Sequence, residues 1–206
     1  MVSGLPEIVQ MTGVCDACQL GKQHRDSFPS KSFRQAGKPL ELVHSDLCGP
    51  MPEPSLGGNR FFISFIDDYS RKVWTYFLKV KSEAFEVFKD FKAQVEKFSG
   101  HHIKTLRTDR GEEYLSNEFE LFCRKSGIKH ELTSRYSPQQ NGVCERKNRT
   151  IMEMARCMLK RKKLPSNFWA EAVSCAAYLI NRSPTKSLEN CTPHETWYGL
   201  SRMFTT

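Results

Sequence analysis

The architecture of this chain can be inferred from residues 103–111, IKTLRTDRG, where an expected strand over Ile103–Thr108 ends in the acidic turn Asp109-Arg110-Gly111. An earlier strand is expected over Leu40–Leu47, and it ends near Asp46. If these two strands are neighbours in one sheet, both aspartates lie at its carboxyl edge. The two acids are therefore the first candidates for a functional site.

The region between these strands is expected to contain a hairpin and a helix. Two β-rich runs, Arg60–Ile66 and Lys72–Val80, predict a pair of strands joined by a polar turn. Apolar residues at helical spacing then predict an amphipathic helix over Ser82–Phe98. Ser82 is a suitable N-cap for this helix, and Gly100 is placed to end it.

The rest of the chain alternates between helices and one more strand. In order we expect a short helix over Asn117–Lys125, a strand over Ile128–Thr133, a loop over 137–142, a long helix broken by Pro165, a helix over Asn167–Asn181 and a loose tail from Pro184. This order predicts an α/β fold, a mixed central sheet flanked by helices. Residues 39–200 would form the core, preceded by an irregular segment over 1–38 and followed by a tail over 201–206.

Composition excludes several classes of protein. The 206 residues include 39% hydrophobic and 26% charged side chains, which is typical of a globular protein and not of a disordered or fibrous one. No apolar run is long enough to span a membrane, and no signal peptide is recognised at the N-terminus. Eight cysteines without a secretory signal indicate reduced thiols. We therefore expect an intracellular protein with no membrane partner.

Positive charge is concentrated in one segment. The net charge is +8, from 31 Lys and Arg against 23 Asp and Glu, and residues 142–163 supply eight cations against two acids. Helical spacing places the following residues in one row: Glu145, Arg149, Met152, Arg156, Lys160 and Lys163. A solvated helix face would explain part of this run, and membrane binding is disfavoured because the opposite face has no aromatic anchor. A footprint for a nucleic-acid backbone explains the whole row better.

Three acids form the candidate site. Asp46 and Asp109 end strands, and Glu145 opens the basic helix. Each acid alone would be explained as a turn former or a helix cap. Together they predict a cluster of carboxylates that binds Mg²⁺ or Mn²⁺, because such groups would otherwise repel one another. A metal site at the head of a basic row suits phosphoryl transfer on DNA or RNA.

Four segments carry a resemblance to a known family. They are HSDLCGP (44–50), FIDDYSRKVW (65–74), RTDRGEEY (107–114) and SPQQNGVCERKNRT (137–150), with 35 residues between Asp109 and Glu145. In this order and spacing they resemble the Asp-Asp-Glu catalytic core of integrases from copia-type LTR retrotransposons. The likeness runs from about Cys15 to Gly199. Because the segments that flank this core in the family are missing here, the chain resembles a fragment of a Pol polyprotein.

The resemblance implies a ribonuclease H-like fold and polynucleotidyl transfer that joins the 3′ ends of element DNA to target DNA. By this analogy two Mg²⁺ or Mn²⁺ ions are expected, with Asp46 as a ligand of both, Asp109 of one and Glu145 of the other. Arg146 and Arg149 would offset charge on the phosphorus. Partners would be DNA and further copies of the chain, and the site of action would be the nucleus.

The loop before the basic helix also belongs to the resemblance. Gln139, Gln140 and Asn141 resemble a flexible active-site loop whose amides contact DNA. The alternative stays open that Asn141 caps the helix and that both glutamines are solvated. The adjacent acids Asp67 and Asp68 are explained by a hairpin turn and are left outside the site.

Two cysteines suggest half of a zinc site. Cys15 and Cys18 have the spacing of paired zinc ligands, but a tetrahedral site needs two more. By resemblance, residues 1–38 are the remnant of a zinc-binding region and a linker whose histidine pair is missing here. His24 is a weak substitute because its surroundings resemble the linker. Zinc is therefore expected only if histidine ligands are supplied, and the other six cysteines are interpreted as buried thiols.

Two other functions remain open at this point. One is a truncated relic of an integrase that binds DNA without catalysis, which the missing flanks favour. The other is a ribonuclease on the same fold, because paired metal ions on carboxylates also hydrolyse RNA. The spacing from Asp109 to Glu145 and the Gln-Gln-Asn-Gly loop favour strand transfer.

Overall fold

A computed structural model describes residues 36–133, 142–189 and 191–200. The strands are β1 (Val43–Cys48), β2 (Phe61–Asp67), β3 (Val73–Leu78), β4 (Thr105–Thr108) and β5 (Lys129–Leu132). The α-helices are α2 (Ala84–Ser99), α3 (Asn117–Lys125), α4 (Gly142–Lys162), α5 (Trp169–Arg182) and α6 (Pro193–Tyr198), with short 3₁₀ turns η1 (Lys81–Glu83), η2 (Glu112–Tyr114) and η4 (Ser166–Phe168). The predicted mixed sheet with flanking helices is confirmed.

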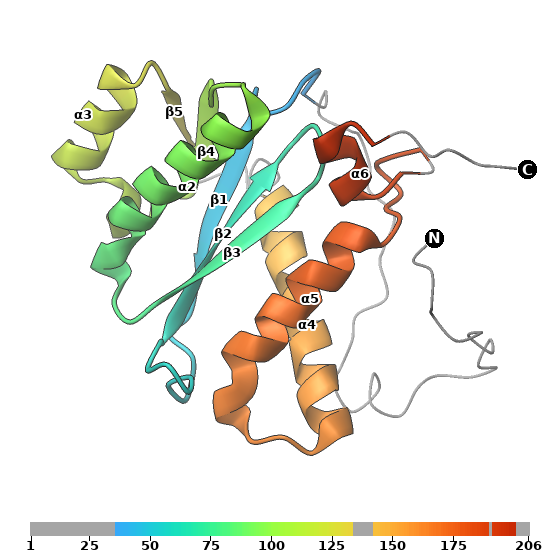
Figure 1. Ribbon diagram of the computed structural model, residues 1–206. Helices are drawn as coiled ribbons and strands as arrows, with labels where there is room; N and C mark the ends of the chain where they lie inside the picture. Colours follow the sequence, from blue (N-terminus) through green and yellow to red (C-terminus); the bar gives the residue numbers. More distant parts are fainter. Residues whose placement is uncertain (1–35, 134–141, 190, 201–206) are drawn as a thin grey trace, which may run out of the picture.

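The sheet has the order β3-β2-β1-β4-β5 (Figure 1). β1 pairs antiparallel with β2 and parallel with β4, and β4 pairs parallel with β5. The parallel register sets Val43 opposite Leu106 and His44 opposite Arg107. Continued by two residues, this register brings Asp46 level with Asp109. The adjacency on which the predicted site depends is therefore confirmed.

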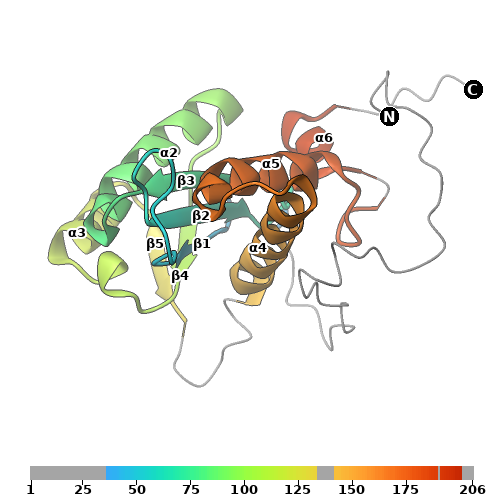
Figure 2. The ribbon, with the colours of Figure 1, turned by 90° about the horizontal axis from the view of Figure 1, so that it is seen from below.

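Helices cover both faces of the sheet (Figures 1 and 2). The α2 and α3 side is closed by an aromatic core in which Phe65 stacks on Phe91 at 4.1 Å between ring centroids. On the other side, α4 and α5 pack on Phe62 and Ile66 of β2. Because strand residues alternate between faces, His44, Asp46 and Cys48 point to the α4 side.

Several local predictions were wrong in detail. The strands β3 and β4 are shorter than predicted, at Val73–Leu78 and Thr105–Thr108. β1 begins at Val43 and not at Leu40, because Leu40 takes a left-handed backbone with φ of 60° and its amide donates to Asp67. Ser82 lies within η1, and the N-cap of α2 is Glu83, whose side chain forms no capping bond. The segment after Pro184 is not a loose tail throughout, because Thr192 and Glu195 form a capping box that starts α6.

The acid pair Asp67 and Asp68, at the end of β2, does more than form a hairpin turn. Asp67 accepts hydrogen bonds from the amides of Leu40 and Ser70, and Asp68 accepts from the amide of Ala36. Asp68 also accepts from His44 and pairs with Arg71. Both acids are buried, and they tie the segment before β1 to the sheet. We interpret both acids as structural and leave them outside the candidate site.

Cysteine burial is more varied than predicted. Cys123, Cys144 and Cys157 are buried, whereas Cys48 and Cys191 are half-buried and Cys175 is exposed. Cys175 lies on the exposed side of α5. Cys15 and Cys18 lie outside the described residues. None of the described helices is long and apolar enough to cross a bilayer.

The open edge of β3 is closed by a side chain. Asn181 of α5 accepts from the Val73 amide at 2.9 Å and donates to the Val73 carbonyl at 2.7 Å, so that it replaces a neighbouring strand at this residue. We expect Asn181→Leu to leave both backbone groups unsatisfied and to lower the free energy of unfolding by about 2–4 kcal/mol. Urea titration checks this, with exposed Asn117→Leu as the control. An equal loss in both variants would contradict it.

Candidate active site

The three predicted acids come from three elements. Asp46 lies near the end of β1, Asp109 directly follows β4, and Glu145 lies in the first turn of α4. Asp46 and Asp109 are half-buried, whereas Glu145 is exposed. The negative charges of Asp109 and Glu145 both act on Asp46, so the fold brings the three acids into one electrostatic environment. Their role as catalytic metal ligands stays a prediction.

Burial and repulsion make Asp46 unusual. Burial raises the pKa of its carboxyl from an ordinary value near 3.8 to about 6, an Asn148 hydrogen bond opposes the rise, and the charges of Asp109, Glu145 and Glu113 add to it. A divalent cation would offset this excess of negative charge, and the donors are oxygens of the kind that Mg²⁺ and Mn²⁺ prefer. In the part of the chain that the structure describes, no three such groups converge closely enough to hold an ion.

Asn148 is a site residue for which the sequence analysis gave no role. It lies three residues after Glu145 on α4, and its Nδ2 donates to Asp46 Oδ2 at 2.9 Å. The side chain is 5% exposed, and its Oδ1 has no partner among the described residues. Spacing of three residues from Glu145 could have indicated this role, because such residues share a helix face.

Glu113 adds a fourth carboxylate. It lies in η2, directly after the acidic turn, and its charge also acts on Asp46. A Cβ at Gly111 would collide with the Glu113 carboxylate, so a larger residue there would push this flexible side chain away from its present position over the turn. In the sequence, the EEY segment (112–114) stands out only through the family resemblance, because the direction of the Glu113 side chain depends on this local turn.

Two buried hydrogen bonds fix the elements around Asp46. Ser64 of β2 lies 3.3 Å from the Cys144 sulfur, which holds the start of α4 against the sheet beside Glu145. On the other face of β1, Ser45 lies 2.9 Å from the Tyr114 hydroxyl and so anchors η2. Both contacts are buried. Burial raises the pKa of the Cys144 thiol, so this sulfur stays protonated and neutral next to the acids.

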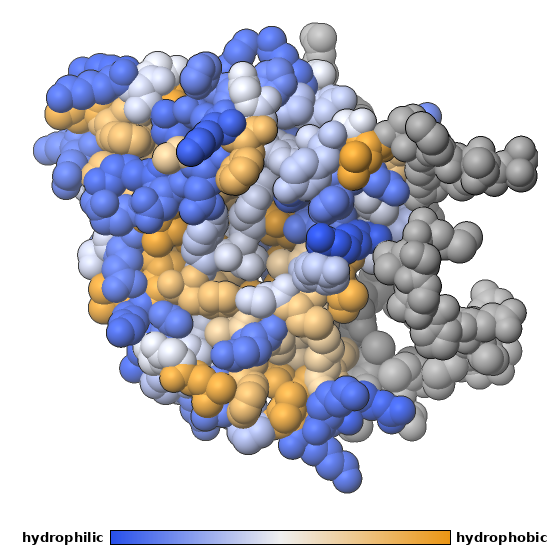
Figure 3. All heavy atoms as spheres, in the orientation of Figure 1, coloured by the Kyte–Doolittle hydropathy of each residue, from blue (hydrophilic) through white to orange (hydrophobic). Residues whose placement is uncertain are grey.

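The predicted basic row is largely present on α4. Its members Arg149, Arg156 and Lys160 are exposed, as is the neighbouring Arg146, whereas Met152 is half-buried against the core. Lys163 does not continue the row, because α4 ends at Lys162 and Lys163 has a left-handed backbone with φ of 54°. Figure 3 shows a group of hydrophilic residues at the lower right of the molecule, where α4 ends in Figure 1. Gln139, Gln140 and Asn141 lie outside the described residues.

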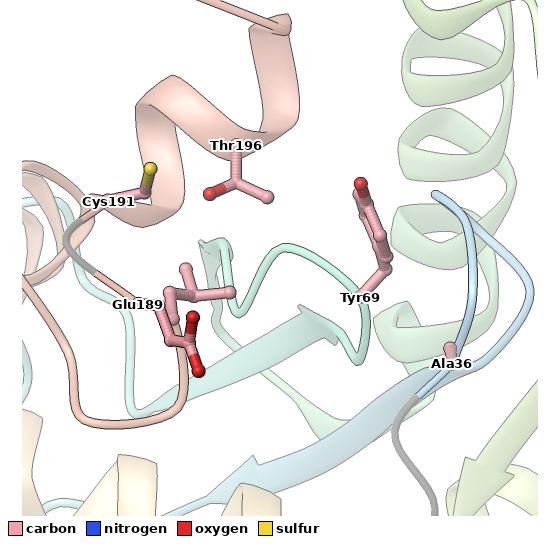
Figure 4. A pocket seen from close by; sticks show the side chains of 6 residues that line it. Ala36, Tyr69, Glu189, Cys191 and Thr196 are labelled. Carbon is pink, nitrogen blue, oxygen red and sulfur yellow. The ribbon is translucent and has the colours of Figure 1, made fainter. Parts of the chain in front are cut away.

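A hollow elsewhere on the surface does not match the acids. It lies between Tyr69 after β2 and the α6 region, where it is lined by Glu189, Cys191 and Thr196 (Figure 4). Glu189 is the one charged group among its described lining residues, and Ala36 and Leu188 add apolar surface. A single exposed carboxylate offers neither a metal site nor a row of cations, so the acid cluster remains the candidate site.

A family model described as integrase core domain matches residues 36–138. The chain is 53% identical to the retrovirus-related Pol polyprotein from transposon TNT 1-94 of Nicotiana tabacum, over 89% of this chain and 14% of that protein. It is 35% identical to the corresponding polyprotein from transposon RE2 of Arabidopsis thaliana, over 90% of this chain and 12% of that protein. The chain thus spans a small part of these relatives.

Two solved structures share the fold. A chain of the simian T-cell lymphotropic virus intasome in complex with PP2A regulatory subunit B56 gamma aligns with a TM-score of 0.65 and 22% identity, over 92% of this chain and 64% of that one. The HTLV-2 integrase catalytic core domain in complex with magnesium, in its trimeric form, aligns with a TM-score of 0.57 and 21% identity, over 77% and 97%. These alignments confirm the predicted integrase-type, ribonuclease H-like fold.

The raised pKa of Asp46 leads to a prediction about stability. The folded carboxyl keeps its proton up to about pH 6, whereas the unfolded one releases it near 3.8, so stability falls as pH rises through this window. At pH values above this window and without metal, Asp46→Asn removes a charge that the folded chain disfavours. It is therefore expected to raise the free energy of unfolding by about 1–3 kcal/mol.

Urea unfolding in EDTA at pH 7.5 and at pH 4.5 checks this prediction, with exposed Asp90→Asn as the control. The gain from Asp46→Asn should shrink toward acidic pH, because wild-type Asp46 is then protonated as well. A gain that is the same at both pH values, or that equals the control, would contradict the assignment.

Proposed function

Because the chain belongs to the integrase core domain family, we propose that it catalyses metal-dependent polynucleotidyl transfer, joining 3′ ends of element DNA to target DNA. One observation carries the proposal. The parallel register of β1 and β4, together with the start of α4, groups Asp46, Asp109 and Glu145 at the head of a helix whose basic face is exposed. Acidic metal ligands beside a phosphate footprint suit phosphoryl transfer better than binding alone.

Asp46, Asp109 and Glu145 are the residues that would hold two divalent ions. Mg²⁺ or Mn²⁺ bound there would activate the attacking 3′-hydroxyl and stabilise the leaving 3′-oxygen. Asn148 orients the Asp46 carboxylate through its amide donor at 2.9 Å. Cys144, packed on Ser64, keeps the first turn of α4 in place and so holds Glu145 at the edge of the sheet.

The exposed cations of α4 would bind the DNA backbone. Arg146 and Arg149 lie within the first two turns, nearest to Glu145, where they can offset charge on the reacting phosphate. Arg156 and Lys160 extend the row away from the acids and would guide the flanking duplex. Of the two solved structures, one is an intasome and the other is a trimeric form. We propose that this chain also acts as a multimer.

Glu145→Gln tests the chemistry. With Mn²⁺ and a branched DNA substrate, wild type should give strand-transfer or disintegration product, and the variant should be slower by about 100-fold or more, because it loses a ligand charge. Exposed Glu171→Gln is the control. Equal product from wild type and Glu145→Gln would show that Glu145 is no ligand. No product from folded, Mn²⁺-binding wild type would favour the non-catalytic relic, and cleavage of RNA alone would favour the ribonuclease.

Charge reversal on α4 tests the DNA footprint. Changing Arg149, Arg156 and Lys160 together to Glu should weaken DNA binding. The plot of log K against log salt should also become less steep, with the magnitude of its negative slope smaller by about 3, because about one counterion is released per phosphate contact. The matched control reverses Lys97, Arg124 and Lys125, which are exposed on α2 and α3 across the sheet. Fluorescence anisotropy over a salt series measures both. An equal loss of DNA affinity in the control would show that net charge, and not a binding surface on α4, explains the effect.

A further inference from the structure

Asp109 lies just beyond the backbone ladder of its strand. β4 pairs with β5 as far as Thr108 opposite Leu132, and its described pairs with β1 end at Arg107. The last bond of this ladder runs from the Thr133 amide to the Thr108 carbonyl. Strand pairing therefore does not hold Asp109, although the proposed chemistry requires its carboxylate in a fixed place.

Two local hydrogen bonds hold Asp109 instead. Its Oδ1 accepts from the Gly111 amide at 3.0 Å, which closes the acidic turn. Its backbone carbonyl accepts from the Thr108 hydroxyl at 2.8 Å. A threonine hydroxyl on its own can rotate away from such a partner, so this second bond depends on what else the hydroxyl contacts.

His130 fixes the direction of that hydroxyl. Its Nε2 lies 2.9 Å from Thr108 Oγ1. The one hydroxyl proton of Thr108 is donated to the Asp109 carbonyl, so the contact is made by an Nε2–H that donates to the hydroxyl oxygen. Thr108 is fully buried, and the His130 side chain is 2% exposed, so water does not compete for either group.

The orientation of the His130 ring comes from α3. Its Nδ1 lies 3.2 Å from the Glu120 carboxylate, and its ring packs against Phe119 at 5.2 Å between centroids. The carboxylate can only accept, so this contact and the Nε2–H donation to Thr108 are both hydrogen bonds when the ring carries a proton on each nitrogen, as in an ion pair with Glu120. His102 forms a similar contact with Glu96, also at 3.2 Å, but is 85% exposed and has no other described hydrogen-bond partner on its side chain. The buried third contact, to Thr108, distinguishes His130 from an ordinary surface pair.

We propose that His130 is a positioning residue for Asp109, acting through the Thr108 hydroxyl. Glu120 and Phe119 hold the imidazole, the imidazole holds the hydroxyl, and the hydroxyl holds the Asp109 peptide from which the carboxylate projects. The inference rests on the proposed function, in which Asp109 is a metal ligand. It adds α3 and β5 to the set of elements on which the site depends.

Two pairs of variants test the inference. Thr108→Val keeps the shape and removes the hydroxyl, and His130→Leu removes the ring donor. Thr108→Ser and His130→Gln keep a hydroxyl and an N–H in corresponding places. The removing variants should lower the Mn²⁺-dependent transfer rate and raise the half-saturating Mn²⁺ concentration by about 10-fold, as is common for groups that orient a metal ligand. DNA affinity should stay unchanged, and the conserving variants should recover most of the rate.

A measurement without metal separates positioning from general destabilisation. The Gly111 amide, which is bound to the Asp109 carboxylate, should shift its ¹H–¹⁵N signal in Thr108→Val and His130→Leu and stay in place in Thr108→Ser, His130→Gln and the control His102→Leu. Urea titration confirms that each variant is folded under the conditions used.

The outcomes separate the two proposals. An unshifted Gly111 signal in folded His130→Leu, or equal rate losses in the removing and the conserving variants, would overturn the positioning role while leaving the proposed function intact. An inactive wild type would instead defeat the proposed function. In that case the Gly111 signal would still decide whether His130 holds Asp109.

Discussion

β1 and β4 are separated in sequence by two strands and a helix, yet they run parallel side by side, and this pairing determines which residues can meet at the site. Parallel neighbours end at the same edge of a sheet, so Asp46 near the end of β1 and Asp109 directly after β4 are brought together. The crossover between them needs β2, β3 and α2, and the buried aromatic core on the α2 side makes that path rigid. The start of α4 then adds Glu145 and Asn148 from the other face.

The site works against the stability of the fold that carries it. Asp46 is half-buried among carboxylates, and its raised pKa shows that the folded chain disfavours its charged form. Asn148 reduces this cost through one hydrogen bond but leaves its own Oδ1 without a partner among the described residues. Such an electrostatic cost is expected where a protein holds groups ready for a cation. The catalytic proposal and the stability of the chain are thus linked through one carboxylate.

α4 has two unlike faces, and the proposed function uses both of them. Ile151 and Ala155 are buried against the sheet, while Arg149 and Arg156 are exposed. A helix that is packed along one side cannot rotate, so the basic face keeps its direction relative to Glu145. Network contacts from β5 and α3 through His130 extend this rigidity to Asp109. Most of the elements therefore contribute to the placement of three short side chains.

The sequence by itself determined the strands, the helices and the three candidate acids, because periodicity and turn residues are local and the integrase motifs are ordered along the chain. It missed α6, although the capping pair Thr192 and Glu195 was readable. The tertiary structure alone established the contacts that Asn148, Glu113 and His130 make around the site. A pattern shows which face of an element a residue occupies, but hydrogen-bond partners such as Asp46 for Asn148 and Thr108 for His130 come from other elements. Those contacts exist only after the sheet order and register bring the elements together.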